Sequence, residues 1–131
     1  MADGLKEEVL ERLAIAKEKL ESAELLLDNQ RYADSISRAY YAMYHAARAV
    51  LFIKNVDPHK HSGVIKMFGL HYVQPEIVEK KYSKALSYLK ELRERCDYES
   101  SAEVDSDECR KVFQDAKEFV KRTEEIVKET F

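Results

Sequence analysis

The chain has 131 residues, of which 45% are apolar and 36% are charged, with only three glycines and two prolines. This composition excludes a disordered tail and favours long amphipathic helices joined by short connections. The net charge of −3 excludes a general electrostatic attraction to nucleic acid, so any such contact requires a local basic patch. The length suits one domain, taken as residues 1–131.

The sequence also carries expectations about location and cofactors. No apolar run approaches the roughly 20 residues that a membrane span needs, and the first residues lack the apolar core of a signal peptide. The two cysteines, Cys96 and Cys109, have no spacing typical of a metal site or a disulfide framework. We therefore expect a cytoplasmic protein without membrane association.

The first predicted helix runs from about Leu5 to Asn29, and its apolar residues alternate spacings of four and three, which places them on one stripe. That stripe comprises Val9, Leu13, Ala16, Leu20, Ala23 and Leu27. A tight link at residues 28–30 predicts an antiparallel second helix, from about Tyr32 to Lys54. The stripe of the second helix comprises Ile36, Tyr40, Met43, Ala47 and Val50.

The middle of the chain predicts a short helix and then a longer one. Asp57 and Pro58 suit the N-cap and first turn of a third helix over about His59 to Tyr72. Pro75 is expected to open a fourth helix. The inward candidates of the fourth helix are Tyr82, Leu86, Leu89 and Cys96.

A polar loop over residues 97–106 is expected before the last helix, where Asp105 and Glu108 resemble a capping box. The stripe of the last helix comprises Cys109, Phe113, Ala116, Val120, Thr123 and Val127. No strand pattern or internal repeat accompanies these helices. The sequence therefore predicts an all-α fold, an up-and-down bundle of four long helices plus one short helix.

The second helix carries a further organised face, nearly opposite its apolar stripe. Its members are Arg38, Tyr41, His45, Arg48 and Phe52. Arginine can donate a pair of hydrogen bonds to a phosphate, histidine can move a proton near neutral pH, and a phenol ring can stack on a base. The same residues could instead pack on the fourth helix or on a second subunit. Both interpretations stay open, and a site at a dimer seam would combine them.

Two smaller polar clusters are weaker candidates. Arg93, Arg95, Asp97 and Tyr98 end the fourth helix, where arginines also complement the helix dipole and Arg93 and Asp97 form an ordinary i,i+4 pair. The segment 59–63, with Lys60 and His61, could contact a phosphate or could be only a polar helix start. Histidines two positions apart on a helix diverge, so no metal site is predicted. Phosphate-loop, dinucleotide-binding and zinc-protease motifs are missing, and no cofactor is expected.

Residues 35–47, with the sequence SISRAYYAMYHAA, resemble a signature of stand-alone HEPN proteins from archaea and bacteria. The segments KHSGV at 60–64 and RCDY at 95–98 are similar in order and spacing. The resemblance implies a helical bundle that pairs into a homodimer and works with a minimal nucleotidyltransferase, often as half of a toxin–antitoxin pair. It also implies binding of a nucleotide or RNA.

Many HEPN relatives are metal-independent ribonucleases, in which an arginine is followed after roughly four to six residues by a histidine near a later helix. There the histidine helps the RNA 2′-hydroxyl attack the adjacent phosphate and the arginine stabilises the developing charge. In this chain the later region, residues 93–98, has arginine but no histidine, whereas Arg38 and His45 have suitable spacing on the second helix. Either this pair is catalytic or the chain binds without cutting, and we favour binding. An active ribonuclease toxin and a purely structural dimer are the alternatives.

Overall fold

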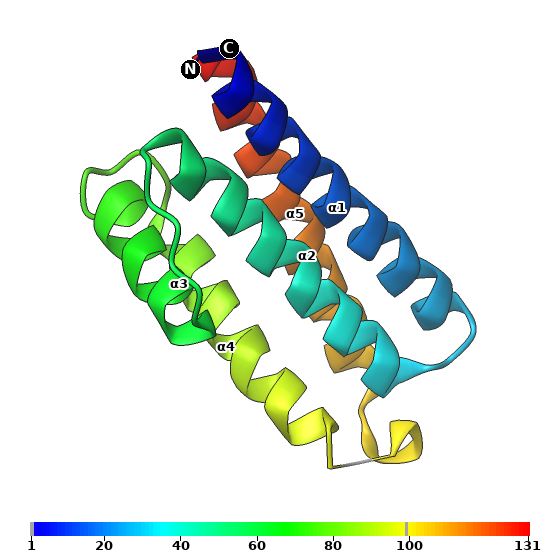
Figure 1. The fold of residues 1–131 in the computed structure, drawn as a ribbon. Coiled ribbons are helices and arrows are strands. Elements are labelled where there is room, and N and C mark those ends of the chain that lie inside the picture. Colours follow the sequence, from blue (N-terminus) through cyan, green and yellow to red (C-terminus); the bar gives the residue numbers. More distant parts are fainter. Residues whose placement is uncertain (1, 99) are drawn as a thin grey trace.

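The computed structural model describes residues 2–98 and 100–131, which contain five α-helices and no strand (Figure 1). The helices are α1 (Ala2–Asp28), α2 (Tyr32–Ile53), α3 (His61–Phe68), α4 (Lys80–Cys96) and α5 (Ser106–Thr130). A π-helical turn, Gly69–Val73, extends α3, and a short 3₁₀ turn, Ser101–Glu103, precedes α5. The predicted all-α fold of four long helices and one short helix is confirmed. None of the described helices combines the length and the apolar character needed to cross a membrane.

Helix α2 lies at the centre of the bundle, with α1 and α3 on opposite sides of it (Figure 1). All five residues of its predicted stripe are fully buried. Four alanines on its other faces are fully buried as well, which lets the neighbouring helices approach α2 closely; they are Ala39, Ala42, Ala46 and Ala49. Because these alanines are buried together with the apolar stripe, less of the α2 surface is left for polar side chains than the sequence predicts.

The first two helices form the antiparallel pair that the tight link predicts. Gln30 adopts a left-handed backbone with φ of 61°, and the amide of Arg31 donates to the carbonyl of Leu26 at 2.8 Å. This hydrogen bond closes the C-terminal turn of α1 and reverses the chain. The predicted stripe of α1 is confirmed, with Leu20 and Leu27 partly buried and the other members buried.

Two predicted helix starts are wrong. α3 begins at His61 with Lys60 as its N-cap residue, because the Asp57 carboxylate accepts hydrogen bonds from arginines instead of backbone amides. Pro75 does not open α4, which begins at Lys80. The intervening turn is closed by the amides of residues 77 and 78, which both donate to the carbonyl of residue 72.

The last helix begins where predicted but is capped differently. The Asp105 carboxylate accepts from the amide of Asp107 at 2.8 Å, which confirms it as the N-cap. The return bond of a capping box is not formed among the described residues, because Glu108 accepts from the hydroxyl of Tyr88. The predicted stripe of α5 is entirely buried, as are Leu86, Leu89 and Cys96 of α4, while Tyr82 is partly buried.

Candidate functional site

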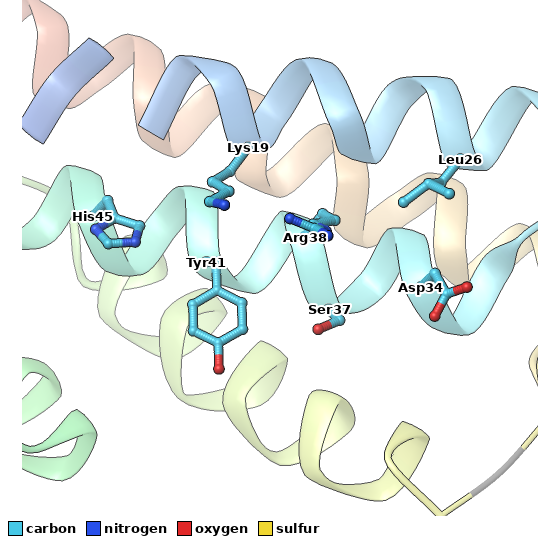
Figure 2. A pocket seen from close by; sticks show the side chains of 7 residues that line it. All are labelled: Lys19, Leu26, Asp34, Ser37, Arg38, Tyr41 and His45. Carbon is cyan, nitrogen blue, oxygen red and sulfur yellow. The ribbon is translucent and has the colours of Figure 1, made fainter. Parts of the chain in front are cut away.

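An open groove of about 650 Å³ lies between α1 and α2, and we call it the α1–α2 groove (Figure 2). Its lining residues are Lys19, Leu26, Asp34, Ser37, Arg38, Tyr41 and His45. Residues 34, 38, 41 and 45 recur at helical spacing along one face of α2, and Lys19 projects toward them from α1 (Figure 2). The groove therefore contains both predicted catalytic residues, Arg38 and His45, together with Tyr41.

The two cations of the α1–α2 groove form no ion pair among the residues that the structure describes. Neither Arg38 nor Lys19 makes a side-chain hydrogen bond or an ion pair with any described residue, and Arg38 is exposed. Elsewhere in the described chain, arginines at positions 12, 48 and 93 all contact carboxylates. Asp34 is the carboxylate that lines the groove, and it makes no ion pair with either cation. The groove can therefore accept an anion without breaking an existing pair.

His45 stands half-buried at one end of the α1–α2 groove (Figure 2). Burial, followed by the nearby charges of Arg48 and Lys19, lowers the pKa of His45 to about 4. The imidazole is therefore neutral at physiological pH, with one nitrogen that donates and one that accepts. Its ring packs edge-on against Tyr44, with centroids 5.2 Å apart. A neutral imidazole here can hydrogen-bond a base or a hydroxyl.

Tyr41 connects the groove to α4. Its ring lines the groove, and its hydroxyl accepts a long hydrogen bond of 3.4 Å from Nη1 of Arg93. The Arg93 guanidinium also lies over the rings of Tyr40 and Tyr41, at 5.2 and 5.4 Å from their centroids. Its remaining ion pair, to Asp97, is also long, at 3.4 Å. Arg93 is thus held mainly by aromatic faces, and the hydrogen bonds that its guanidinium donates are long and weak.

His61, at the start of α3, contacts the same tyrosines of α2. Its Nδ1 lies 2.6 Å from the hydroxyl of the buried Tyr40, and its ring stacks on Tyr44 with centroids 4.3 Å apart. Burial, followed by the charge of Arg93, lowers the pKa of His61. His61 and Arg93 therefore contact the same pair of rings, Tyr40 and Tyr41, although 32 positions separate them in the sequence.

Arg48 and Phe52, predicted on the same polar face, belong to a different cluster. Asp57 accepts from Nη2 of Arg48 at 2.8 Å and from both terminal nitrogens of Arg12 at 3.0 and 3.3 Å. The Arg12 guanidinium lies over the Phe52 ring, 4.3 Å from its centroid. These two arginines hold the pKa of Asp57 at about 2. Arg48 therefore anchors the loop after α2 and does not line the α1–α2 groove.

Comparison with known proteins supplies the family. The HEPN domain family matches residues 9–126, which is most of the chain. The chain belongs to the HEPN domain family. Among its relatives, a UPF0332 protein of Pyrococcus horikoshii is 55% identical over 82 residues, which cover 63% of this chain and 58% of that protein. The aligned part thus spans less than two thirds of the Pyrococcus protein's length.

Two proteins of Methanocaldococcus jannaschii are similar over nearly the whole chain. Both carry the name "Putative toxin". The first is 38% identical over 95% of this chain and 92% of its own length. The second is 27% identical over 93% of this chain and 83% of its own length.

The remaining predicted residues of this HEPN chain lie away from the α1–α2 groove. Arg95 points toward α5, where its Nη2 lies 3.5 Å from Glu108. Tyr98 is 92% exposed, and Lys60 is exposed at the start of α3. Asp97 contacts Arg93 at the C-terminus of α4. Of the predicted site residues outside α2, only Arg93 and His61 come near the groove, because both contact the tyrosines of α2.

Sequence reasoning missed Lys19, Leu26, Asp34 and Ser37. Asp34 lies four positions before Arg38 and Ser37 four positions before Tyr41, so the pattern on α2 alone could have found them. Lys19 could have been found from the antiparallel link, because Lys19 and Tyr41 are each 11 positions from Gln30. Within the described residues, no three histidine, cysteine, aspartate or glutamate side chains are grouped to hold a metal ion.

Proposed function

We propose that this HEPN protein is a cytoplasmic module that binds a nucleotide or a single strand of RNA in the α1–α2 groove. The observation that carries the proposal is the pair of cations, Lys19 and Arg38, which form no ion pair with a described residue and share an open groove with Tyr41. Guanidinium and ammonium groups bind phosphate oxygens strongly, and the phenol ring offers a surface for stacking. In this proposal the whole chain, residues 1–131, forms one HEPN domain.

Each lining residue has a role in this proposal. Arg38 and Lys19 bind phosphate oxygens from opposite walls of the groove. Tyr41 stacks on a base, and the neutral His45 hydrogen-bonds to a base edge or a ribose hydroxyl. A net charge of −3 would repel nucleic acid at long range, so the affinity must come from this local site. Calorimetric titration of nucleotides and short RNA into the wild-type protein tests the proposal.

We further propose that the protein forms a homodimer and acts with a minimal nucleotidyltransferase in a toxin–antitoxin-like system. The names of the two Methanocaldococcus relatives support the toxin side of such a pair. Co-expression with a minimal nucleotidyltransferase from the same genome, followed by purification through a tag on one partner, tests this association. A stable complex is expected, and separate elution of the two proteins would contradict it.

A metal-independent ribonuclease is the second candidate, and the position of His61 favours it. His61 brings an imidazole to the tyrosines that also contact Arg93, and in this proposal it takes the role of the histidine that residues 93–98 lack. The other candidate pair is Arg38 and His45, which are separated by a rise of about 10 Å along α2. Cleavage of RNA in the presence of a metal chelator, abolished by His61→Gln or by His45→Gln, would establish this activity and identify its histidine.

A further inference from the structure

A second groove, of about 690 Å³, runs between α4 and the segment formed by α3 and its π-helical turn, and we call it the α3–α4 groove. In Figure 1, α3 lies on the side of α2 opposite to α1, so this groove is separate from the α1–α2 groove. Nothing in the proposed nucleotide-binding function uses it. Apolar side chains and lysines line it together, and this combination indicates a protein partner.

Accessible apolar side chains line the α3–α4 groove. Leu70 is 44% exposed and Tyr88 is 48% exposed, and the half-buried Ile65 and Val73 lie beside them. Large apolar side chains exposed singly are ordinary on a protein surface, but two exposed and two half-buried ones lining one groove indicate a binding site. Leu70 and Val73 come from α3's extension and Tyr88 from α4, so a partner could contact both walls.

Hydrogen bonds to the rest of the chain hold both sides of the α3–α4 groove, the π-helical turn and Tyr88 of α4, in place. Tyr72, inside the π-helical turn, is buried and donates through its hydroxyl to the carbonyl of Val50. Lys54 donates to the carbonyl of His71 at 2.6 Å, which ties the turn to the end of α2. On the opposite wall, the Tyr88 hydroxyl donates to Glu108 at 2.8 Å and so orients the ring. A site whose side chains are already ordered loses less entropy on binding.

The charge of the α3–α4 groove is opposite to that of the whole chain. Lys66, Lys80 and Lys84 line it, and none of the three forms an ion pair with a described residue. Glu91 is the one carboxylate in the lining, whereas the chain as a whole has a net charge of −3. Unpaired lysines around an apolar floor complement an acidic segment that also presents apolar side chains.

We propose that the α3–α4 groove binds an acidic amphipathic helix of a separate protein partner. A helix fits because a groove between two packed segments accepts apolar side chains repeated at i, i+3, i+4 and i+7, with acidic residues facing the lysines at its edge. Three of the four apolar lining side chains, Ile65, Leu70 and Val73, are aliphatic and offer no stacking surface. Tyr88 is the one aromatic ring among the described lining residues, which favours a protein over a nucleic acid. A bulged π-helical turn at one wall fits this assignment, because such turns are frequent at functional sites.

The test uses fluorescence anisotropy with the full-length protein and three labelled probes. The first is a designed acidic amphipathic helix of about five turns, or ~18 residues. The second has the same composition in scrambled order, without the apolar stripe, and the third is a short poly(U) RNA. We expect the amphipathic peptide to bind at least about tenfold more tightly than the scrambled one, and its binding to weaken as salt rises.

Variants of exposed residues locate the binding. Leu70→Ser should weaken the amphipathic peptide at least about fivefold, as expected for a contact residue in a groove. A triple variant, Lys66→Gln, Lys80→Gln and Lys84→Gln, should weaken binding and reduce its salt dependence. The matched control is Leu25→Ser, because Leu25 is 65% exposed on α1 and lies outside this groove. It should leave the affinity unchanged.

Three outcomes would overturn the proposal. The first is no binding of the acidic amphipathic peptide up to about 1 mM. The second is RNA binding in this groove, seen as a poly(U) affinity that falls in the lysine variant while peptide binding is absent. The third is self-association, in which Leu70→Ser breaks a dimer in light scattering and the peptide does not compete with that dimer.

Discussion

The hydroxyl of Tyr40 lies 2.6 Å from Nδ1 of His61, so a fully buried residue of α2 holds the first residue of α3. The same imidazole stacks on Tyr44, one turn further along α2. Burial raises the pKa of Tyr40, so the phenol keeps its proton and can donate. This contact places His61 among the tyrosines that Arg93 also touches.

Tyr40→Phe is therefore expected to lower the free energy of unfolding by about 0.5–1.5 kcal/mol, because it removes one buried hydrogen bond and keeps the ring. Tyr41→Phe is the matched control, since its hydroxyl makes only a 3.4 Å contact with Arg93 and its loss should cost less than about 0.5 kcal/mol. Urea unfolding of the two variants measures the difference. Equal stability of Tyr40→Phe and the wild type would show that the hydrogen bond to His61 contributes nothing.

Asp57→Asn is expected to lower the free energy of unfolding by about 1–3 kcal/mol, because Arg12 and Arg48 would lose their shared counter-charge. The arginine side chains are only 12% and 21% exposed, so water replaces the carboxylate poorly. Asp107→Asn serves as control, because its side chain is 94% exposed and its cost should stay within about 0.5 kcal/mol. The denaturant midpoints of the two variants measure this difference, and equal midpoints would show that Asp57 contributes nothing to stability.

The pH dependence of stability should report on His45. The folded pKa of His45 is about 4, below the value of 6.5 expected in the unfolded chain, so the unfolded chain binds the proton first as pH falls. Stability is therefore greatest above pH 6.5 and decreases as pH falls from 6.5 toward 4. His45→Gln should flatten this decrease, and the difference between the two unfolding curves isolates the histidine. Parallel curves for variant and wild type would rule out this role.

A homodimer is expected in solution, and light scattering at micromolar concentration tests it. The structure changes the reason for this expectation. Phe52 and Tyr41, which the sequence offers for packing on a second subunit, contact Arg12 and Arg93 within the chain. The prediction now depends on the two-fold pairing that the HEPN resemblance implies. A monomer at every concentration tested would disprove it.

Helix stripes were predictable from sequence because burial imposes a helical period on apolar residues. Ile36, Tyr40 and Met43 lie in the core for that reason. Caps were less predictable, since the best partner for a capping side chain can come from a distant segment. Asp57 follows a helix and precedes a proline, yet it pairs with Arg12, 45 positions away.

The candidate site was predictable only in part. Arg38, Tyr41 and His45 share one helix, so their spacing alone placed them together. Arg48 shares that spacing too, but Asp57 holds it in another cluster, and no pattern on α2 reveals that contact. Lys19 could have been added from the antiparallel link between α1 and α2. His61 reaches the face of α2 from another helix, so only the packing of α3 shows its position.

The most direct test of the proposed function is calorimetric titration of a nucleotide and a short RNA into three proteins: wild type, Arg38→Gln and Arg110→Gln. Arg110 is the charge-matched control, because it lies on α5, outside the α1–α2 groove, with a side chain 60% exposed. We predict that the wild type and Arg110→Gln bind alike. Arg38→Gln should bind more weakly by about 1.5–3 kcal/mol, the loss expected for a charged hydrogen bond, with an unchanged melting temperature. Equal binding by all three proteins, or no binding by the wild type together with unfolding or loss of the dimer in Arg38→Gln, would contradict the proposal and assign this face of α2 a structural role.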